Sequence, residues 1–277
     1  MKKNELLVDK VIGLLLQAKM PTYLHKFGPK KYKLWQHVLA LFVKQECKLS
    51  FRRVVNLLNG LQQKVPTYSA LCKSNKRIPL KVWQHLLQVS ANIKKMLIGA
   101  MDAVFFSRTN PSYHYLKRID RELPVSKPVQ ATALIDTKTK KCVALRVRAK
   151  RVHDACDRFY LLKHSPLQPN ILVADKAYDC NDLHAYAKHH GFKTNIPIKK
   201  NTHKGFYRNY MKRFFDERIY HKRSLIETNF SCVKRKTGSH AACHSARTQR
   251  AEIFTKFITN NLKLIKTIDF QLSRFNA

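Results

Sequence analysis

The chain has 277 residues, and its 54 Lys and Arg against 17 Asp and Glu give a formal net charge of +37 at pH 7. Self-repulsion of that size opposes compaction, so the charge predicts a polyanionic partner rather than a structural need. A hydrophobic fraction of 44% with only 7 Gly and 10 Pro excludes a disordered chain. The basic residues run along the whole sequence, which indicates a folded nucleic-acid-binding protein with salt-sensitive affinity. Membrane-surface binding is the weaker alternative, since no amphipathic stretch is set apart for it.

The start of the chain does not read as a secretory signal, because Glu5 and Asp9 interrupt its apolar residues. No stretch approaches the roughly 18 apolar residues needed to span a bilayer. The seven cysteines are odd in number and widely spread, which predicts free thiols in a reducing cytoplasm. A zinc site is disfavoured, because Cys232, His240, Cys243 and His244 lack an accepted ligand spacing.

Residues 1–95 are predicted to form a small all-α domain. Ser50 is a plausible N-cap for a basic helix that ends near Asn59-Gly60. Another short helix is expected to begin after Thr67. Short basic helices joined by a tight turn are typical of a helix-turn-helix DNA reader. An ordinary helical subdomain explains the same pattern equally well.

The pattern of apolar residues changes near Lys95, from helical spacing to short apolar runs. Residues 97–106 form an apolar run with Asp102 inside it, which predicts a buried strand. Residues 130–135 and 142–149 are predicted to form a β-hairpin. In its second strand, apolar residues alternate with Arg146 and Arg148, which predicts one core face and one largely basic face.

A parallel unit is predicted after the hairpin. Residues 171–174 read as a buried strand that ends at Asp175, followed by a helix over 181–190 and a strand over 192–198. Such a βαβ unit places Asp175 at the carboxyl end of a strand, where open α/β sheets bind ligands. Further helices are expected from Tyr220 and over residues 248–268. The order predicts an α/β fold with a mixed sheet flanked by helices.

Three of the acids are poorly explained by ordinary structure. Asp102 lies inside an apolar strand, Asp175 ends another, and Glu227 lies in a basic helix. A hydrogen-bonded buried acid and a simple turn are the alternatives for the first two. A buried carboxylate is costly unless it is paired or binds a metal, and three converging carboxylates favour Mg²⁺ or Mn²⁺. The remaining acids near this region are expected to cap or start helices: Asp154, Asp157, Asp179 and Asp182.

The third acid lies in the pattern Y-x2-R-x3-E-x6-K, formed by Tyr220, Arg223, Glu227 and Lys234. At about 100° per residue in an α-helix, these four side chains share one helix face. A carboxylate flanked by two cations and a phenol suits a metal-binding acid beside a phosphate backbone. The alternative is a solvated basic helix in which Glu227 merely offsets Arg223 four residues earlier.

From about residue 95 to 265, these residues resemble the DDE transposases of prokaryotic insertion sequences, in the branch with a Y-R-E-K signature. The sequence DKAYD at 175–179 is close to the typical motif of that branch. The resemblance implies an RNase H-like catalytic domain over residues 96–277, including the C-terminal helices, behind a DNA-end-binding domain over 1–95. It implies that the catalytic, metal-binding acids are Asp102, Asp175 and Glu227. It also implies that the residues that hold DNA phosphates are Tyr220, Arg223 and Lys234.

The activity implied by the resemblance is transposition by phosphoryl transfer, with two Mg²⁺ or Mn²⁺ ions. The substrates would be double-stranded transposon ends and target DNA, bound by a homodimer in the nucleoid. Two features depart from the family: Ala103 replaces a small hydroxyl residue, and the segment between Asp175 and Glu227 is too short for the large β insertion of some relatives. The alternatives are an RNase H-like nuclease without strand transfer and a decayed, purely DNA-binding derivative.

Overall fold

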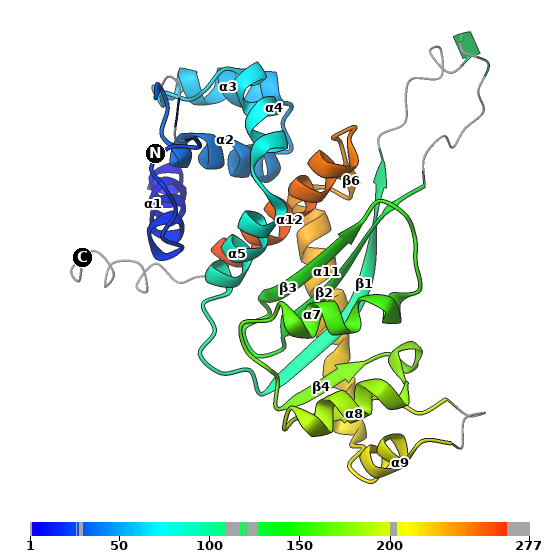
Figure 1. The fold of residues 1–277 in the computed structure, drawn as a ribbon. Coiled ribbons are helices and arrows are strands. Elements are labelled where there is room, and N and C mark those ends of the chain that lie inside the picture. The colour runs from blue at the N-terminus through cyan, green and yellow to red at the C-terminus, as the bar shows by residue number, and fades with distance from the viewer. Residues whose placement is uncertain are drawn as a thin grey trace. The chain divides into compact units, whose positions relative to one another are not determined.

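The computed structural model describes residues 2–25, 27, 30–108, 117–118, 120, 127–199 and 204–264 (Figure 1). The chain divides into two compact units. The first, here called the helical unit, ends its N-terminal part at Asn92 and also includes Val233–Gly238 and the chain from Ala251 onward. The second, the sheet unit, comprises Ile93–Cys232 and Ser239–Arg250. The first boundary lies close to the predicted residue 95, whereas the prediction kept all residues from 96 to 277 together.

The N-terminal part of the helical unit is helical, as predicted. The side chain of Ser50 accepts a hydrogen bond from the backbone N–H of Arg53 at 3.3 Å, and Thr67 accepts one from Ala70 at 3.4 Å. These are the helix starts that the sequence indicated. The helices are α1 (Lys2–Gln17), α2 (Leu34–Glu46), α3 (Phe51–Gly60), α4 (Tyr68–Arg77) and α5 (Leu80–Ala91).

The last described helix, α12 (Ala246–Lys263), makes its polar contacts from Ala251 onward with residues of the helical unit. Glu252 pairs with Lys44 at 3.6 Å, and both side chains are buried. Asn261 donates a hydrogen bond to the hydroxyl of Ser90 at 3.0 Å. These long-range contacts explain why α12 belongs to the helical unit from Ala251 onward, although its first turn, up to Arg250, belongs to the sheet unit. The predicted extension of this helix to residue 268 lies outside the described residues.

The sheet unit contains a mixed sheet in the order β3-β2-β1-β4-β5, with β6 paired to the far end of β1. β1, β2 and β3 are antiparallel, and β4 and β5 are parallel to β1. The predicted hairpin and the predicted βαβ unit are therefore both present, and the predicted α/β fold with a mixed sheet flanked by helices is confirmed. The described strands are β1 (Ile98–Arg108), β2 (Val129–Asp136), β3 (Cys142–Arg148), β4 (Ile171–Ala174), β5 (Lys193–Asn195) and β6 (His240–Ala241).

Helices cover both sides of this sheet: α7 and α8 lie on one side and α11 on the other (Figure 1). β2 is buried along its whole length, and β3 is buried from Cys142 to Leu145. Strands buried on both faces consist of continuous apolar runs, so the predicted separation of core and basic faces holds only at the end of β3. The shorter elements of this unit are η1 (Asp154–Asp157), α7 (Arg158–Lys163), η2 (Lys176–Tyr178), α8 (Asn181–His189) and α9 (Phe206–Lys212).

The helix predicted to begin at Tyr220 is interrupted. α10 (Glu217–Tyr220) is followed by the 3₁₀ turn η3 (His221–Arg223), and α11 (Ser224–Thr237) begins only then. A 3₁₀ turn has about three residues per turn, so the 100° spacing does not apply across η3. The prediction that all four signature residues share one face of one helix is therefore wrong. None of the described helices has the length and apolar composition to cross a bilayer.

Candidate active site

Asp102 lies in the middle of β1, the central strand of the sheet. Its backbone pairs with Ala133 of β2, and the preceding residue, Met101, pairs with Ala174 of β4. Its carboxylate is only 19% exposed, and Oδ1 accepts a hydrogen bond from the backbone N–H of Ala103 at 2.8 Å. The backbone of residue 103 thus orients the acid, whichever side chain that residue carries.

Asp175 directly follows β4 and lies next to Asp102. The last residue pair between the parallel strands β1 and β4 is Met101 with Ala174. Asp102 and Asp175 are the residues that follow this pair, one on each of the two neighbouring segments. Residues in register on adjacent strands point to the same side of a sheet. Asp175 Oδ1 accepts a hydrogen bond from the backbone N–H of Lys176 at 2.7 Å, as Asp102 does from its own successor. Each of the two carboxylates is thus held by the backbone N–H of the residue that follows it.

The electrostatics of Asp102 place further acids nearby. Burial raises the pKa of Asp102 above its ordinary value, and the charges of Asp154 and Asp175 add to that increase. The hydrogen bond from Ala103 and the charge of Arg223 oppose it without cancelling it. A desolvated carboxylate close to other carboxylates is an anion that gains strongly from a cation.

Arg223 connects the strand acids to Glu227. Its Nη1 donates to Asp102 Oδ2 at 3.1 Å, and its Nη2 lies 3.0 Å from Glu227 Oε1. Although burial alone lowers the pKa of Arg223, the charges of Glu227 and Asp102 raise it overall. The i,i+4 pair proposed as the ordinary explanation for Glu227 exists, but the same guanidinium also holds Asp102. Glu227 is therefore linked to Asp102 through one shared guanidinium.

The other two signature residues are placed differently. Tyr220 ends α10 and lies close enough to Arg223 to raise the pKa of that side chain. Lys234 follows Glu227 by seven residues on α11, about two helical turns, and it belongs to the helical unit. Within the described ranges, no three His, Cys, Asp or Glu side chains converge closely enough to hold one metal ion. The structure thus places Asp175 next to Asp102 and links Glu227 to Asp102 through Arg223.

Asp157 is a buried acid rather than the predicted helix cap. It is fully buried, and Arg148 donates to its Oδ1 from Nη2 at 2.6 Å and from Nε at 2.8 Å. Thr132 donates to Oδ2 at 3.0 Å. Hydrogen bonding to Asp157 raises the pKa of Arg148. Part of the basic face predicted for β3 is therefore used inside the fold, against this carboxylate.

Asp179 is also buried, although the sequence suggested a helix start. Its Oδ1 accepts hydrogen bonds from His184 Nε2 at 2.9 Å and Arg208 Nε at 2.8 Å, and its Oδ2 accepts one from the backbone N–H of Lys199 at 3.0 Å. Burial alone raises the pKa of Asp179, but these three donors hold it below its ordinary value. The network fixes the end of η2 and so positions the segment that begins at Asp175. No local spacing reveals it, because Arg208 lies far along the chain.

Residues 94–262 match the family model described as the transposase DDE domain. The match covers more than half of the 277 residues and includes the two strand acids and Glu227. The chain belongs to the transposase DDE-domain family. Transposition and DNA recombination are the processes of this family. The comparison with curated proteins gives no match.

Among solved structures, the chain is similar to the piggyBac transposase in its synaptic complex with hairpin DNA. The identity is 9% and the TM-score 0.45, over 99% of this chain and 80% of that one. At this level the likeness adds nothing to the family assignment, which rests on the match to residues 94–262.

Proposed function

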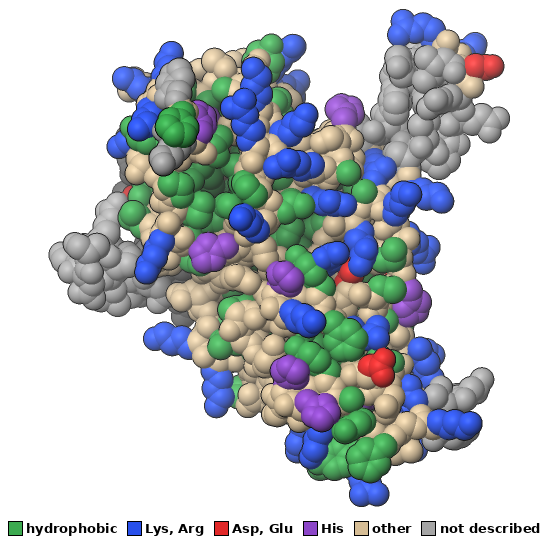
Figure 2. All heavy atoms as spheres, in the orientation of Figure 1, with side chains coloured by type: hydrophobic (Ala, Val, Ile, Leu, Met, Phe, Trp, Pro, Cys, Tyr) green, Lys and Arg blue, Asp and Glu red, His purple; other side chains and the backbone are tan. Residues whose placement is uncertain are grey.

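We propose that this chain is the transposase of a prokaryotic insertion sequence, which cleaves DNA at the ends of the element and joins them to target DNA. The observation that carries the proposal is that Asp102 and Asp175 directly follow the last residue pair of β1 and β4, while Arg223 links Glu227 to Asp102. The net charge of +37 supports a DNA partner. Figure 2 shows Lys and Arg side chains spread widely over the displayed face.

The donor set fits a divalent cation. Asp102, Asp175 and Glu227 offer carboxylate oxygens, which Mg²⁺ and Mn²⁺ prefer. The half-buried Asp102, whose pKa is raised by burial and by neighbouring acids, favours a cation beside it. We expect these three acids to hold two such ions. When bound, a pair of ions stabilises the attacking and leaving oxygens of phosphodiester displacement.

In this proposal Arg223 also binds a DNA phosphate. Its guanidinium is engaged by Asp102 and Glu227, and a DNA phosphate is a competing bidentate partner for the same group. A phosphate that takes Arg223 releases carboxylate oxygens for the cation. Tyr220 and Lys234 are the further residues that we expect to hold phosphates of the transposon end. DNA binding and cation binding would then favour each other.

The proposed reaction also suggests which region recognises DNA ends, which oligomer forms on DNA and where in the cell the protein works. The α1–α5 region is proposed to recognise the transposon ends, because α3 and α4 are short helices that carry basic residues and no acid. Pairing of two DNA ends requires two active sites, so we expect a homodimer on DNA. A protein that acts on chromosomal DNA would work in the cytoplasm, associated with the nucleoid.

The test is a joining assay with the purified full chain. The substrate is a DNA fragment carrying the sequences that flank the gene, and the target is a supercoiled plasmid, with Mg²⁺ or Mn²⁺ added. The expected result is nicking at the fragment ends followed by covalent joining to the plasmid, and no product with Asp102→Asn. Cleavage without joining would instead identify a nuclease, and salt-sensitive binding without cleavage would identify a DNA-binding derivative. Either result contradicts the proposal.

A further inference from the structure

Asp154 opens η1 and is held in place by a buried amide. Gln130 of β2 is fully buried, and its Nε2 donates to Asp154 Oδ1 at 2.8 Å. The other end of the same amide, Oε1, accepts a hydrogen bond from the backbone N–H of Val152 at 2.8 Å. One buried side chain therefore uses both ends to fix the segment before η1 and to orient the carboxylate of Asp154.

Asp154 does not serve the structural roles that an acid at this position usually has. His153 accepts the hydrogen bond from the N–H of Ala155 at 3.3 Å and so caps η1. In the described part of the chain, Asp154 has no ion-pair partner, and Gln130 is its hydrogen-bond donor. Asp157, at the other end of η1, is fully buried and bound by Arg148. Of these two acids, Asp157 stabilises the fold, whereas the second oxygen of Asp154 makes no hydrogen bond with a described residue.

Asp154 lies beside the proposed metal site. η1 packs against η2, the turn that follows Asp175 directly. Burial is the main cause of the raised pKa of Asp102, and Asp154 and Asp175 both add to it. Asp102 on β1 is therefore within electrostatic reach of both Asp154 and Asp175, and the packing of η1 against η2 brings the segments that carry these two acids together.

Tyr178 supplies an independent sign that something binds here. Its side chain is 1% exposed, and its hydroxyl makes no hydrogen bond with any described residue. Burial raises the pKa of Tyr178, and four carboxylates raise it further: Asp102, Asp154, Asp157 and Asp175. The phenol thus lies among these acids. An unpaired buried hydroxyl is costly, so its position among acids indicates a ligand or ordered water that completes its hydrogen bonding.

We propose that Asp154 is a fourth carboxylate of the site and accepts hydrogen bonds from the water carried by the divalent cation, with the Tyr178 hydroxyl as a further polar partner. Mg²⁺ keeps several of its waters and binds through one or two carboxylates. The inference rests on the proposed cation site at Asp102 and Asp175.

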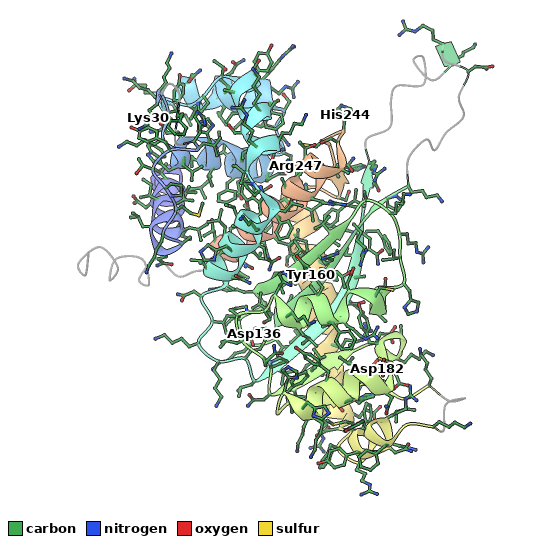
Figure 3. All side chains as sticks on the ribbon, in the orientation of Figure 1. Lys30, Asp136, Tyr160, Asp182, His244 and Arg247 are labelled. Carbon is green, nitrogen blue, oxygen red and sulfur yellow. The ribbon has the colours of Figure 1, made fainter. Side chains whose placement is uncertain are left out.

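The test measures Mn²⁺ affinity of the full chain by electron paramagnetic resonance of free Mn²⁺, with and without a duplex oligonucleotide. Asp154→Asn keeps the size of the side chain and removes its charge. We expect it to weaken Mn²⁺ binding by about tenfold, the lower end of the range for groups around a ligand shell. Tyr178→Phe should also weaken binding while leaving the fold intact. The matched control is Asp182→Asn, an exposed acid of α8 labelled in Figure 3, which should bind as the wild type does.

The outcomes separate this inference from the proposed function. If Asp102→Asn loses Mn²⁺ and Asp154→Asn binds it as tightly as the wild type, the role of Asp154 is overturned and the metal site at Asp102 stands. Wild-type affinity in Asp102→Asn, or no binding by the wild type in either condition, overturns both. Circular dichroism shows whether Asp154→Asn folds. If it does not fold, Asp154→Glu keeps the charge but moves the oxygens, and wild-type affinity in that variant overturns the role.

Discussion

Arg223 and Asp102 are separated by 121 residues in the sequence and joined by a 3.1 Å hydrogen bond between Nη1 and Oδ2. The other arm of the same guanidinium pairs with Glu227 at 3.0 Å. A fixed cation of the protein thus engages two of the three acids that we expect to bind metal ions. The DNA-free molecule thereby balances charges that otherwise repel one another.

The first prediction concerns competition between Arg223 and metal ions. Arg223→Ala should raise the Mn²⁺ affinity of the DNA-free protein, because the carboxylates lose their internal cation. The same change should weaken DNA binding and reduce the salt slope of log affinity by about one. Mn²⁺ titration and DNA binding at several salt concentrations measure the two effects. Arg218→Ala, at an exposed position of α10, is the control for metal affinity. A fall in DNA-free Mn²⁺ affinity for Arg223→Ala would refute competition.

The second prediction concerns the three proposed catalytic acids. Asp102→Asn, Asp175→Asn and Glu227→Gln should each reduce DNA cleavage by about a hundredfold or more, the scale of losing one preorganised electrostatic group. Binding to DNA should remain close to that of the wild type, because no cation of the protein is removed. Single-turnover cleavage and a DNA-binding titration at the same salt concentration check the two parts. Normal cleavage by any one variant removes that acid from the site.

The third prediction concerns Lys234 on α11. If its ammonium group holds a phosphate of the transposon end, Lys234→Ala lowers affinity for DNA and reduces the salt slope by about one. Lys163→Ala, which removes an exposed lysine from the last turn of α7, gives the comparison. Fluorescence anisotropy over a series of salt concentrations measures both slopes. Equal slopes for the two variants would argue against a specific phosphate contact at Lys234.

The fourth prediction concerns pH and the network around Asp179. Burial lowers the pKa of His184 below its ordinary value of 6.5, although Asp179 acts to raise it. Folded His184 is therefore neutral, with Nε2–H donating to Asp179 and Nδ1 accepting from Thr194 Oγ1 at 2.6 Å. The unfolded chain binds a proton as pH falls below about 6.5. Stability should therefore decrease from that pH down to the lowered pKa of the folded state.

His184→Gln removes this titration and keeps an amide donor for Asp179. Between pH 7 and 5, the thermal midpoint of the variant should fall less than that of the wild type. At pH 8 the variant should be less stable by about 1 kcal/mol for one altered hydrogen bond, or roughly 2–4 °C. The depressed pKa of Asp179 affects stability only at lower pH, near and below about 3.9. Thermal unfolding followed by circular dichroism measures the midpoints, with His221→Gln as an exposed control. If the thermal midpoint of His184→Gln depends on pH as that of the wild type does, His184 is not the source of the pH dependence of stability.

The strands that carry the first two acids could be predicted because their signals are local. The apolar run around Asp102 and the run that ends at Asp175 are each bounded by turn residues, so sequence alone indicates two buried strands. Strand pairing then follows from the hairpin and the βαβ unit. The neighbourhood of Asp102 and Asp175 is thus a consequence of topology.

Other parts of the site depend on contacts that no local pattern contains. Asp157 and Asp179 resemble helix-start residues in the sequence, and only their partners Arg148 and Arg208 make them buried acids. The break before α11 arises where η3 packs against β1 and β4, and Arg223 binds a strand residue from there. A helical wheel assumes one α-helical spacing throughout. It therefore cannot show that packing against the sheet turns one segment into a 3₁₀ turn. The grouping of α12 with the helical unit likewise rests on contacts such as Lys44 with Glu252.

The two sides of the site differ in rigidity, because Asp102 lies on the central strand β1 and Glu227 lies at the start of a helix. From Gly99 to Phe106 each residue pairs with β2, while Ile98–Met101 also pair with β4. Glu227, by contrast, lies in the first turn of α11 with its side chain 58% exposed. Amide hydrogens of the central strand should exchange only through the largest openings of the sheet, and those at the start of α11 through fraying. If the chain binds DNA as proposed, we expect the strand to stay fixed and the start of α11 to adjust to the DNA backbone.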